Sequence, residues 1–325
     1  MEENIFEQRT DLSELKNAVE TLKQEIGKVI VGQEQMVELL LAAILADGHV
    51  LIEGVPGVAK TLTAKLLSKS IAAGFSRIQF TPDLMPSDVI GTSLFNPKET
   101  TFQFRQGPIF SNIILIDEIN RAPAKTQAAL FEVMEERQVT VDGYTYHLPP
   151  PFMVVATQNP IEQEGTYHLP EAQLDRFLFK INVVYPSQEQ EFDVVKRHHL
   201  MSAERMLDQV QEVISSAVIL GLREQVRMIH VEDKLITFIT MIVGSTRAHK
   251  SIYLGASPRA SIGILNGAKA LAAMRGRDFI TPEDIIYIAP AVLRHRIALS
   301  PEKEMEGADT DEIISQIIKG IDVPR

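Results

Sequence analysis

The sequence predicts a parallel α/β sheet followed by a helical region, and three observations lead to this fold class. Short apolar runs that suit buried strands alternate with helical segments up to about residue 186, and this alternation favours a parallel α/β sheet. After Tyr185-Pro186 no further runs of that kind occur, and the remaining segments have helical periodicity. The length of 325 residues allows one large domain or two ordinary ones. We therefore expect two domains, residues 1–186 and 187–325.

The composition excludes several classes of protein. Asp and Glu number 43 against 32 Lys and Arg, and the net charge of −11 argues against a strongly basic nucleic-acid surface, although a local basic channel remains compatible with it. Cysteine is absent, which excludes disulfides, thiolate zinc sites and a cysteine nucleophile. The acidic N-terminus lacks the apolar region of a signal peptide, and no apolar run approaches the roughly 20 residues of a membrane helix. We expect a cytoplasmic protein without membrane insertion.

The N-terminal segment is predicted to form two helices. Asp11 and Glu14 resemble a capping box at the start of the first helix, and the second is expected from about Gln33 to Leu45. Apolar residues at spacings of three and four place one face of the first helix against the core: Leu12, Leu15, Val19, Leu22, Ile26 and Ile30.

The predicted sheet is built from four apolar runs. The first, Val50 to Ile52, is followed by a Gly- and Pro-containing turn at residues 54–57 and a helix from Thr61 to Ser70. The other strands and the longest intervening helix are expected at Ile113–Ile116, Met153–Ala156, Phe179–Val184 and, for the helix, Ala124–Glu136. Two stretches break this alternation. Val139–Leu148 is predicted to be a hairpin around Asp142-Gly143, and Gly91–Phe110 holds Asn96-Pro97-Lys98 between apolar or aromatic runs.

Three helix starts are predicted in the second domain. Ser187 with Gln190 forms a capping box, Ser257-Pro258 an N-cap followed by proline, and Thr281-Pro282-Glu283-Asp284 a third start. The charged stretch 300–311 is expected to be a loop before a last short helix.

Residues Gly54 to Thr61 nearly fit the phosphate-loop pattern G-x-x-x-x-G-K-[ST]. A small-residue turn between a strand and a helix lets backbone N–H groups surround phosphate oxygens, and the helix adds its positive N-terminal end. Lys60 would reach the β- and γ-phosphates of ATP, and the Thr61 hydroxyl would ligate Mg²⁺. Ala59 stands where the pattern has Gly, which is tolerable at negative φ and costly otherwise. The alternative is an ordinary strand-to-helix turn with a surface lysine.

Polar residues also follow two of the other predicted strands. Asp117 and Glu118 end the strand 113–116, and ligands of open α/β sheets bind at the carboxyl ends of strands. Asp117 is placed to hold Mg²⁺, and Glu118 to orient and deprotonate the attacking water, unless the pair only caps a helix. Asn159, after the strand 153–156, is placed to touch the γ-phosphate or the water, or else belongs to a turn before Pro160.

Together these stretches resemble an AAA+ ATPase, and more closely the MoxR family, which is related to the magnesium chelatase motor subunit. The resemblance covers roughly residues 30–300, and the Ala in the phosphate loop is usual in this family. It rests on the following stretches: Val31-Gly32-Gln33, GVPGVAKT at 54–61, LIDEINRAP at 115–123, ATQNP at 156–160, LPEAQLDRF at 169–177 and GASPRA at 255–260.

The resemblance implies a fold and further site residues. The fold is a three-layer α/β/α core with strand order 5-1-4-3-2 and an all-helical lid. Asn159 resembles sensor 1, Arg176 the arginine finger that acts in trans, and Arg259 sensor 2. Residues 91–110 match the helix-2 insert and 139–148 the pre-sensor-1 hairpin. The expected nucleotide-binding residues are Val31, Gly32, Gly54, Val55, Pro56, Gly57, Val58, Ala59, Lys60, Thr61 and Leu62.

Taken from the residues alone, two arginines have alternatives. Arg176 could form an ion pair with Asp175 or Glu171, and Arg121, after the acidic pair, could brace a subunit interface. Arg259 is expected in the first turn of a helix, where the helix dipole disfavours a cation, and this suggests an anionic partner.

The resemblance also implies an assembly and partners. We expect a hexameric ring that hydrolyses Mg²⁺-ATP between subunits and remodels, matures or inserts metal into partner proteins, including proteins with von Willebrand factor A domains. A nucleic-acid translocase or chelatase motor is the alternative. It is disfavoured because the predicted hairpin has no Lys or Arg between residues 139 and 148, while the insert offers Lys98 and Arg105. A nucleotide-gated module without hydrolysis is disfavoured by Glu118 and Arg176.

Overall fold

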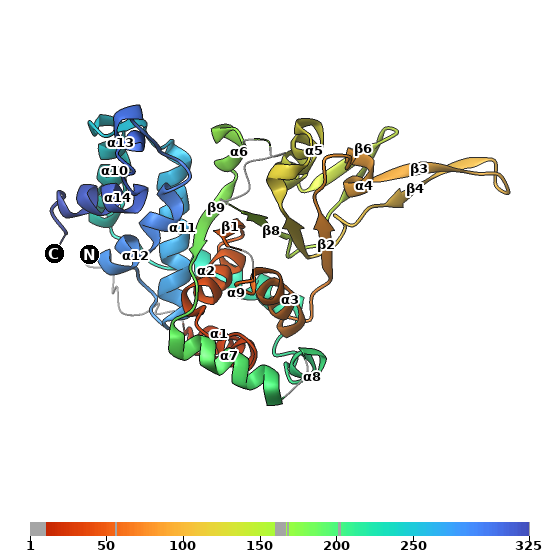
Figure 1. The fold of residues 1–325 in the computed structure, drawn as a ribbon, viewed down its shortest axis with the longest axis horizontal. Helices are drawn as coiled ribbons and strands as arrows, with labels where there is room; N and C mark the ends of the chain where they lie inside the picture. The colour runs from red at the N-terminus through yellow and green to blue at the C-terminus, as the bar shows by residue number, and fades with distance from the viewer. Residues whose placement is uncertain (1–10, 56, 160–166, 168, 201–202, 325) are drawn as a thin grey trace, which may run out of the picture.

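The computed structural model describes residues 11–55, 57–159, 167, 169–200 and 203–324, and its centre is a parallel sheet (Figure 1). Neighbouring strands are hydrogen-bonded in the order β2-β5-β8-β1-β9, and every pair is parallel. Counted along the chain, this is the expected order 5-1-4-3-2. The strands are β1 (His49–Gly54), β2 (Phe75–Gln79), β5 (Ile113–Asp117), β8 (Met153–Gln158) and β9 (Phe177–Val183).

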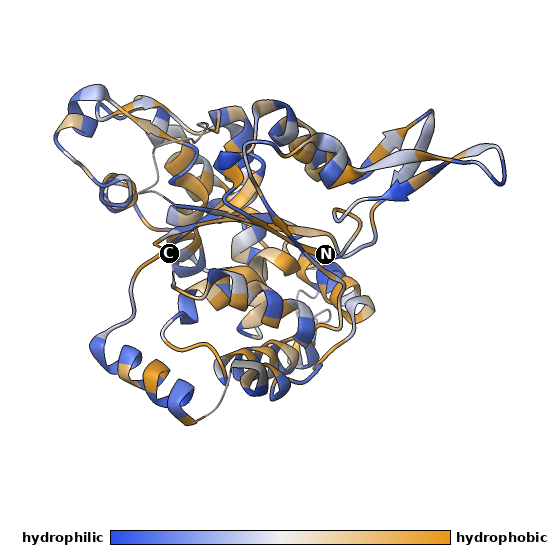
Figure 2. Cartoon of the chain, turned by 45° about the vertical axis from the view of Figure 1, so that its right-hand side comes forward, coloured by the Kyte–Doolittle hydropathy of each residue, from blue (hydrophilic) through white to orange (hydrophobic). Residues whose placement is uncertain are grey.

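Alternate residues of each strand enter cores on opposite faces of the sheet. In β1, Val50 and Ile52 belong to a large hydrophobic cluster with α1 (Ser13–Gly27), α2 (Glu34–Leu45) and α3 (Lys60–Ser70). Leu51 points the other way, into a second cluster with α5 (Ala124–Glu136). The three-layer architecture therefore follows from the two-residue period of strands whose faces are both apolar. Figure 2 shows these apolar segments meeting at the sheet.

The sequence prediction omitted one strand of the sheet. Strand β2 lies at the edge, paired only with β5 in this sheet, and Ile78 is its one buried residue. Its other four residues are not buried, so it has no continuous apolar run, and such runs indicate the other strands. The remaining predicted strands are correct within two residues at each end, and helix α5 has the expected bounds.

The predicted capping box of the first helix is wrong. Helix α1 begins at Ser13, and its N-cap Leu12 makes no side-chain capping bond. Asp11 Oδ1 instead accepts a hydrogen bond from the Ser13 N–H at 2.9 Å. Asp11 thus acts two residues before the helix.

The chain after β9 is mainly helical, with two departures from expectation. A small antiparallel pair, β10 (Ile252–Leu254) and β11 (Ala298–Leu299), interrupts it, and the expected loop 300–311 contains α13 (Pro301–Met305). The three predicted helix starts are confirmed. The other helices are α7 (Gln188–Leu200), α8 (Ala203–Asp208), α9 (Ser216–Arg227), α10 (Asp233–Ala248), α11 (Pro258–Met274), α12 (Pro282–Leu293) and α14 (Thr310–Lys319).

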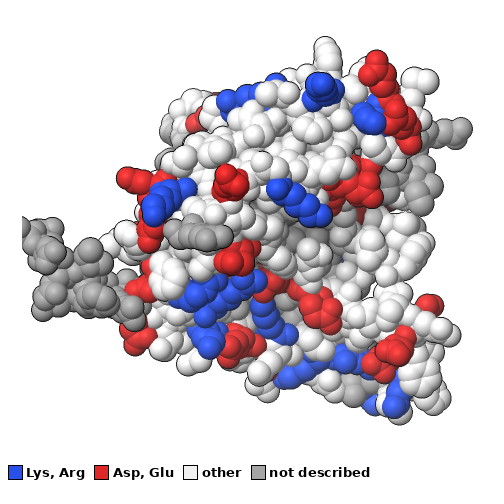
Figure 3. Space-filling view, turned by 90° about the vertical axis from the view of Figure 1, so that its left-hand side faces the viewer, with Lys and Arg blue, Asp and Glu red and all other residues white. Residues whose placement is uncertain are grey.

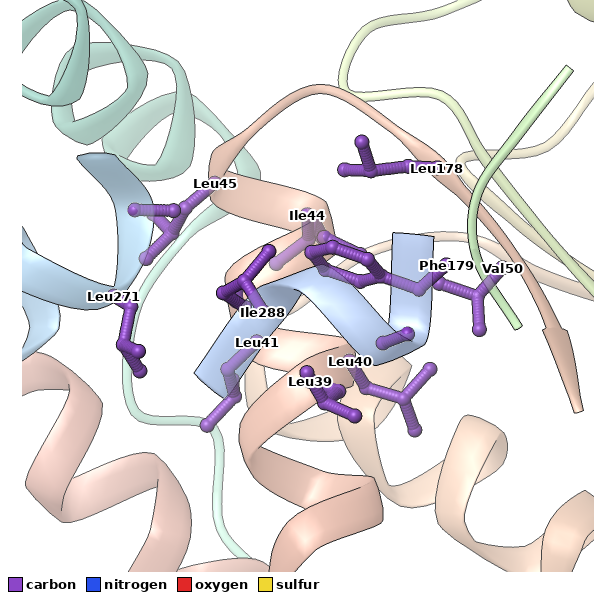
Figure 4. Packing of buried hydrophobic residues seen from close by; sticks show 14 of the residues in the cluster. Leu39, Leu40, Leu41, Ile44, Leu45, Val50, Leu178, Phe179, Leu271 and Ile288 are labelled. Carbon is purple, nitrogen blue, oxygen red and sulfur yellow. The ribbon is translucent and has the colours of Figure 1, made fainter. Parts of the chain in front are cut away.

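Helices α11 and α12 pack directly against the sheet. Ile288 of α12 lies beside Leu41, Ile44 and Phe179 in one cluster (Figure 4). A Cβ at Gly267 of α11 would lie 2.7 Å from Ile288 Cγ2 and 2.9 Å from Phe179 Cζ. Gly267 therefore allows the close approach of α11 to both neighbours.

Two hairpins project from the end of the molecule opposite helices α10, α13 and α14 (Figure 1). Strands β3 (Gly91–Asn96) and β4 (Thr101–Gln106) form one, and β6 (Gln138–Val141) and β7 (Tyr144–His147) form the other, around the expected Asp142-Gly143 turn. The hairpins contact each other, because the rings of Phe104 and Tyr146 lie 4.5 Å apart and the Ser93 hydroxyl bonds to the Asp142 carboxylate.

Within the described ranges, no helix is long and apolar enough to cross a membrane.

Candidate nucleotide site

The phosphate loop joins the end of β1 to the start of α3. Gly57 has a φ of +88° and Ala59 a φ of +61°, and Pro56 lies outside the described residues. The left-handed conformation at Ala59 is the costly case for a residue with a Cβ, by about 1–2 kcal/mol. It turns the chain sharply into α3, whose first N–H groups have no partner within the helix. These groups are the backbone donors that phosphate-binding turns use.

The side chain of Lys60 folds back over the loop. Its Nζ donates to the Gly54 carbonyl oxygen at 2.5 Å. This bond ties the start of α3 to the end of β1 and keeps the ammonium group beside the loop. Lys60 also lines a cavity of about 400 Å³ together with Gly57, Val58, Ala59, Thr61, Leu62, Arg77, Gln79, Asp117, Glu118, Thr157 and Asn159.

Asp117 is the centre of a polar cluster in this cavity. Its Oδ1 accepts hydrogen bonds from the hydroxyls of Thr157, at 3.1 Å, and Thr61, at 3.4 Å. Its Oδ2 lies 2.7 Å from Arg77 Nε. The side chain of Asp117 is 10% exposed, so these contacts offset the cost of burying its charge.

The residues around Asp117 suit a magnesium ion that also binds nucleotide phosphates. A hydroxyl and a carboxylate oxygen converge in the cavity, and Mg²⁺ prefers such oxygen ligands, usually one or two from the protein and the rest from water and phosphate. Within the described ranges, no group of three or more His, Asp or Glu side chains could hold a metal by itself. Thr61 and Asp117 would therefore hold Mg²⁺ jointly with a nucleotide.

Glu118 is held next to Asp117 in a constrained backbone conformation. Its φ is +57°, and its Oε2 accepts from Gln79 Nε2 at 2.8 Å and lies 2.9 Å from Arg121 Nε. Its N–H donates to the Thr157 hydroxyl at 3.1 Å. The carboxylate faces the cavity that Asn159 also lines. Arg121 thus pairs with Glu118 within this chain.

A second, mostly apolar cavity of about 610 Å³ adjoins the phosphate loop. It shares Gly57, Val58, Ala59 and Leu62 with the polar cavity. Val31 lines it as expected, whereas Gly32, Gly54 and Val55 line neither cavity. Gly32 instead approaches Gln190, whose Cδ would lie 2.6 Å from an added Cβ. Further lining comes from α7 and the segments flanking it, including Tyr185, Val194, Val195, His198 and Met206.

Sequence reasoning missed three polar residues of the site. Arg77 and Gln79 belong to the overlooked edge strand β2, where they alternate around Ile78. Thr157 is the second-last residue of β8, two positions before Asn159. The parallel register places Gln79 opposite Asp117, so recognition of β2 as a strand would have brought Arg77 and Gln79 to the acidic pair.

Arg176 lies at the opposite end of the parallel strands from the phosphate loop. It immediately precedes Phe177, which pairs with His49 at the start of β1, whereas Lys60 follows the end of that strand. Six residues of extended strand span about 20 Å. Arg176 and Arg259 are both absent from the lining of the two cavities, and Arg176 cannot reach the phosphate loop of its own chain.

One carboxylate joins Arg176 to Arg259. Glu135 Oε2 lies 3.1 Å from Arg176 Nε, and Glu135 Oε1 lies 2.9 Å from Arg259 Nη2. The ion pairs considered for Arg176 with Asp175 or Glu171 are thus replaced by a pair with the end of α5. Asp175 instead pairs with Arg296 Nε at 2.7 Å and accepts from the Ser257 hydroxyl at 3.0 Å.

Comparisons with known proteins place these features in a family. Residues 49–179 match the ATPase family associated with various cellular activities (AAA), and residues 244–317 match the AAA lid domain. The Bacillus subtilis protein YeaC is 48% identical over 93% of either chain. Chaperone MoxR1 of Mycobacterium tuberculosis is 44% identical over 93% of this chain and 81% of its own.

The fold and a more distant relationship agree with this match. The solved structure of a predicted ATPase from Cytophaga hutchinsonii superposes with a TM-score of 0.89, at 44% identity and 97% coverage of both chains. Magnesium-chelatase subunit ChlI-1 of Arabidopsis thaliana is 24% identical over 63% of this chain and 46% of its own.

Proposed function

The chain belongs to the MoxR family of AAA ATPases and hydrolyses ATP, and from this premise we propose that it is a cytoplasmic, ring-forming motor that remodels protein clients. The boundary between the nucleotide-binding core and the lid is proposed near residue 186, between the end of β9 and the start of α7. The hexamer is the proposed form of the ring. The name of the chaperone MoxR1 supports protein clients.

We assign the polar cavity to the triphosphate and the apolar cavity to the base. Lys60 and the N–H groups at the start of α3 would bind the phosphates, and Thr61 and Asp117 would hold Mg²⁺, which neutralises charge on the phosphates when bound. Glu118 would accept the proton of the attacking water, and Asn159 would contact the terminal phosphate. Gln79 and Arg121 would orient the Glu118 carboxylate.

The observation that carries the proposal is the position of Arg176 and Arg259 at the end of the strands that lies away from the phosphate loop. Two arginines that share a carboxylate there are too far from the phosphate loop to serve the site of their own chain, and this supports a role in the site of a second copy. We therefore propose that both act in trans, in the next protomer of the ring. Arginines supplied in trans contribute on the order of 10³–10⁵ in rate in related phosphoryl transfers.

Turnover measured against protein concentration tests the shared site. ATP hydrolysis per chain should rise with concentration and then saturate, and sedimentation velocity should show assembly over the same range. Constant turnover per chain at concentrations where sedimentation shows only single chains would contradict the proposal.

The projecting hairpins are the proposed client contacts. Phe95 and Phe102 near the tip of β3–β4 are 52% and 71% exposed, and Tyr144 of β6–β7 is 70% exposed. Aromatic side chains exposed together on a protruding element are typical of protein-interaction surfaces. Proteins with von Willebrand factor A domains are proposed as one class of client, on family resemblance.

A nucleic-acid motor is the second candidate, favoured only by Lys98 and Arg105 on the first hairpin. Figure 3 shows the side of the C-terminal helices, away from these hairpins, where positive and negative side chains lie side by side. Fluorescence anisotropy with single-stranded DNA at low salt separates the two candidates, since nucleic-acid motors bind most tightly under those conditions. Binding weakened by loss of Lys98 and Arg105 would favour the motor.

A further inference from the structure

Glu135, the second-last residue of α5, lies between two arginines. Its two oxygens each contact a different guanidinium, Arg176 from the core at 3.1 Å and Arg259 from the lid at 2.9 Å. A carboxylate that accepts from two guanidiniums presents the same kind of oxygen acceptors as a phosphate group. Glu135 therefore occupies the position between the two arginines that a phosphate would need.

The charges around this contact do not balance. Two guanidiniums face one carboxylate, and the nearest other acid, Asp175, is committed to Arg296 and Ser257. Asp175 Oδ2 lies 3.9 Å from Arg259 Nη1, at the limit of an ion pair. The two arginines therefore keep a net positive charge that a more highly charged anion would neutralise better than Glu135 does.

The contact is also exposed enough to be exchanged. The side chains of Arg176, Glu135 and Arg259 are 28%, 40% and 52% exposed, and exposed ion pairs contribute little to stability. By contrast, Arg296 is buried and also donates to the carbonyls of Phe177 and Leu178. The arginines can therefore leave Glu135 while the Asp175–Arg296 pair keeps the lid in place.

Helix electrostatics do not account for either partner. Glu135 is an anion at the C-terminal end of α5, and Arg259 is a cation in the first turn of α11. Each lies at the end of its helix where the dipole disfavours its charge. Their pairing across the core and lid, rather than local helix stability, is what these positions provide.

We propose that Glu135 is a placeholder for the nucleotide of the neighbouring protomer. It holds the guanidiniums of Arg176 and Arg259 side by side in the free chain, and it is displaced by the terminal phosphate of ATP when two protomers meet. This rests on the proposed function, because it takes both arginines to act in trans. Glu135 is then a positioning residue that makes assembly depend on the terminal phosphate.

The test is ATP-dependent assembly of Glu135→Gln, with Glu136→Gln as the matched control on the next, exposed residue. Sedimentation velocity gives the protein concentration at half assembly with ATPγS, a slowly hydrolysed analogue, and with ADP. Without the competing carboxylate, Glu135→Gln should assemble with ATPγS at an about threefold lower concentration, while assembly with ADP stays unchanged. Glu135→Asp, which keeps the charge on a shorter chain, should lie between Glu135→Gln and wild type.

Other results would overturn the inference. Weaker or unchanged assembly of Glu135→Gln with ATPγS, or an equal shift with ADP, would mean that Glu135 only links core and lid, and circular dichroism would identify an unfolded variant. Arg176→Ala and Arg259→Ala test the proposed function separately. If both arginine variants assemble and turn over as wild type does, the trans assignment fails. If they do not, but Glu135→Gln is silent, only the placeholder role fails.

Discussion

At the scale of single residues, we propose that hydrolysis depends on Glu118. Its carboxylate is held by Gln79 and Arg121 in the cavity that contains the phosphate loop. Glu118→Gln keeps the shape and the hydrogen bonds to donors but cannot accept a proton from water. We expect turnover to fall at least about 10²-fold while ATP binding by calorimetry stays within a factor of a few. Glu132→Gln, an exposed acid on α5, is the control, and undiminished turnover of Glu118→Gln would refute the assignment of the base.

Ala59 is a residue whose backbone works against stability. Its φ of +61° favours glycine. Ala59→Gly should therefore raise the free energy of unfolding in urea, without nucleotide, by up to about 1 kcal/mol. Ala128→Gly, in the middle of α5, should lower it by about 1 kcal/mol. If both variants lose stability equally, the left-handed conformation at Ala59 is wrong.

Burial of His49 predicts a loss of stability in acid. Its Nδ1 accepts the Val154 N–H at 3.0 Å, so Nε2 carries the proton and donates to the Met134 carbonyl at 3.2 Å. Burial lowers its pKa from 6.5 to about 4. Between these values the unfolded chain binds a proton that the folded chain does not, so stability is full above pH 6.5 and falls as the pH drops toward 4.

The size of this effect can be measured by urea unfolding across that pH range. His49 should contribute a loss of up to about 3 kcal/mol, and buried His295, whose pKa is also lowered by burial, adds in the same direction. His49→Gln should flatten the acid slope, whereas His147→Gln, at an exposed position, serves as the control. If the acid slope of His49→Gln equals that of the wild type, the pKa of His49 is not lowered in the folded chain, and the folded chain binds the proton as readily as the unfolded chain does.

Residues of the site could be predicted where they belong to contiguous motifs. Lys60, Thr61, Asp117 and Glu118 follow directly from strand ends and a small-residue turn. The partners of Arg176 could not be predicted in this way, because Glu135 is 41 positions away and meets it only through the packing of α5 against the sheet.

At the scale of elements, apolar runs revealed strands β1, β5, β8 and β9 but not β2. Most residues of β1, β5, β8 and β9 are buried, and each of these strands contains a run of at least three apolar residues. In β2 only Ile78 is buried, and Arg77 and Gln79 on either side of it contact Asp117 and Glu118. A strand whose side chains line a polar cavity lacks the apolar run by which buried strands are recognised.

The junction between α6 (Glu171–Leu174), β9 and the lid depends on Asp175. Its carboxylate compensates the buried guanidinium of Arg296, whose pKa is lowered by burial and raised by Asp175. Asp175→Asn should lower the free energy of unfolding by about 3 kcal/mol, because it leaves a buried charge without its counter-ion. Urea denaturation checks this, with Asp193→Asn on the exposed face of α7 as control. A loss below about 0.5 kcal/mol would mean that the Arg296 contacts to carbonyls suffice.

At the scale of the whole molecule, the candidate nucleotide site and the two arginines lie at opposite ends of the parallel strands of one sheet. In the proposed assembly, a single chain therefore carries two halves of different sites, and repetition of one interface between copies can close a ring. The resemblance to AAA+ proteins predicted the sheet order and the trans arginine together. The sequence motifs alone did not predict the trans role of Arg176, because the position of Arg176 relative to Lys60 depends on which strands are neighbours.

The most direct measurement mixes two variants that are each expected to be inactive, Glu118→Gln and Arg176→Ala. In a mixed ring, an Arg176→Ala protomer still has Glu118, and it can receive an intact Arg176 from a neighbouring Glu118→Gln protomer. The account predicts that ATP turnover reappears in the mixture, in proportion to the sites that combine both intact residues. A mixture as inactive as its components, under conditions where sedimentation shows mixed assemblies, would contradict a site shared between chains.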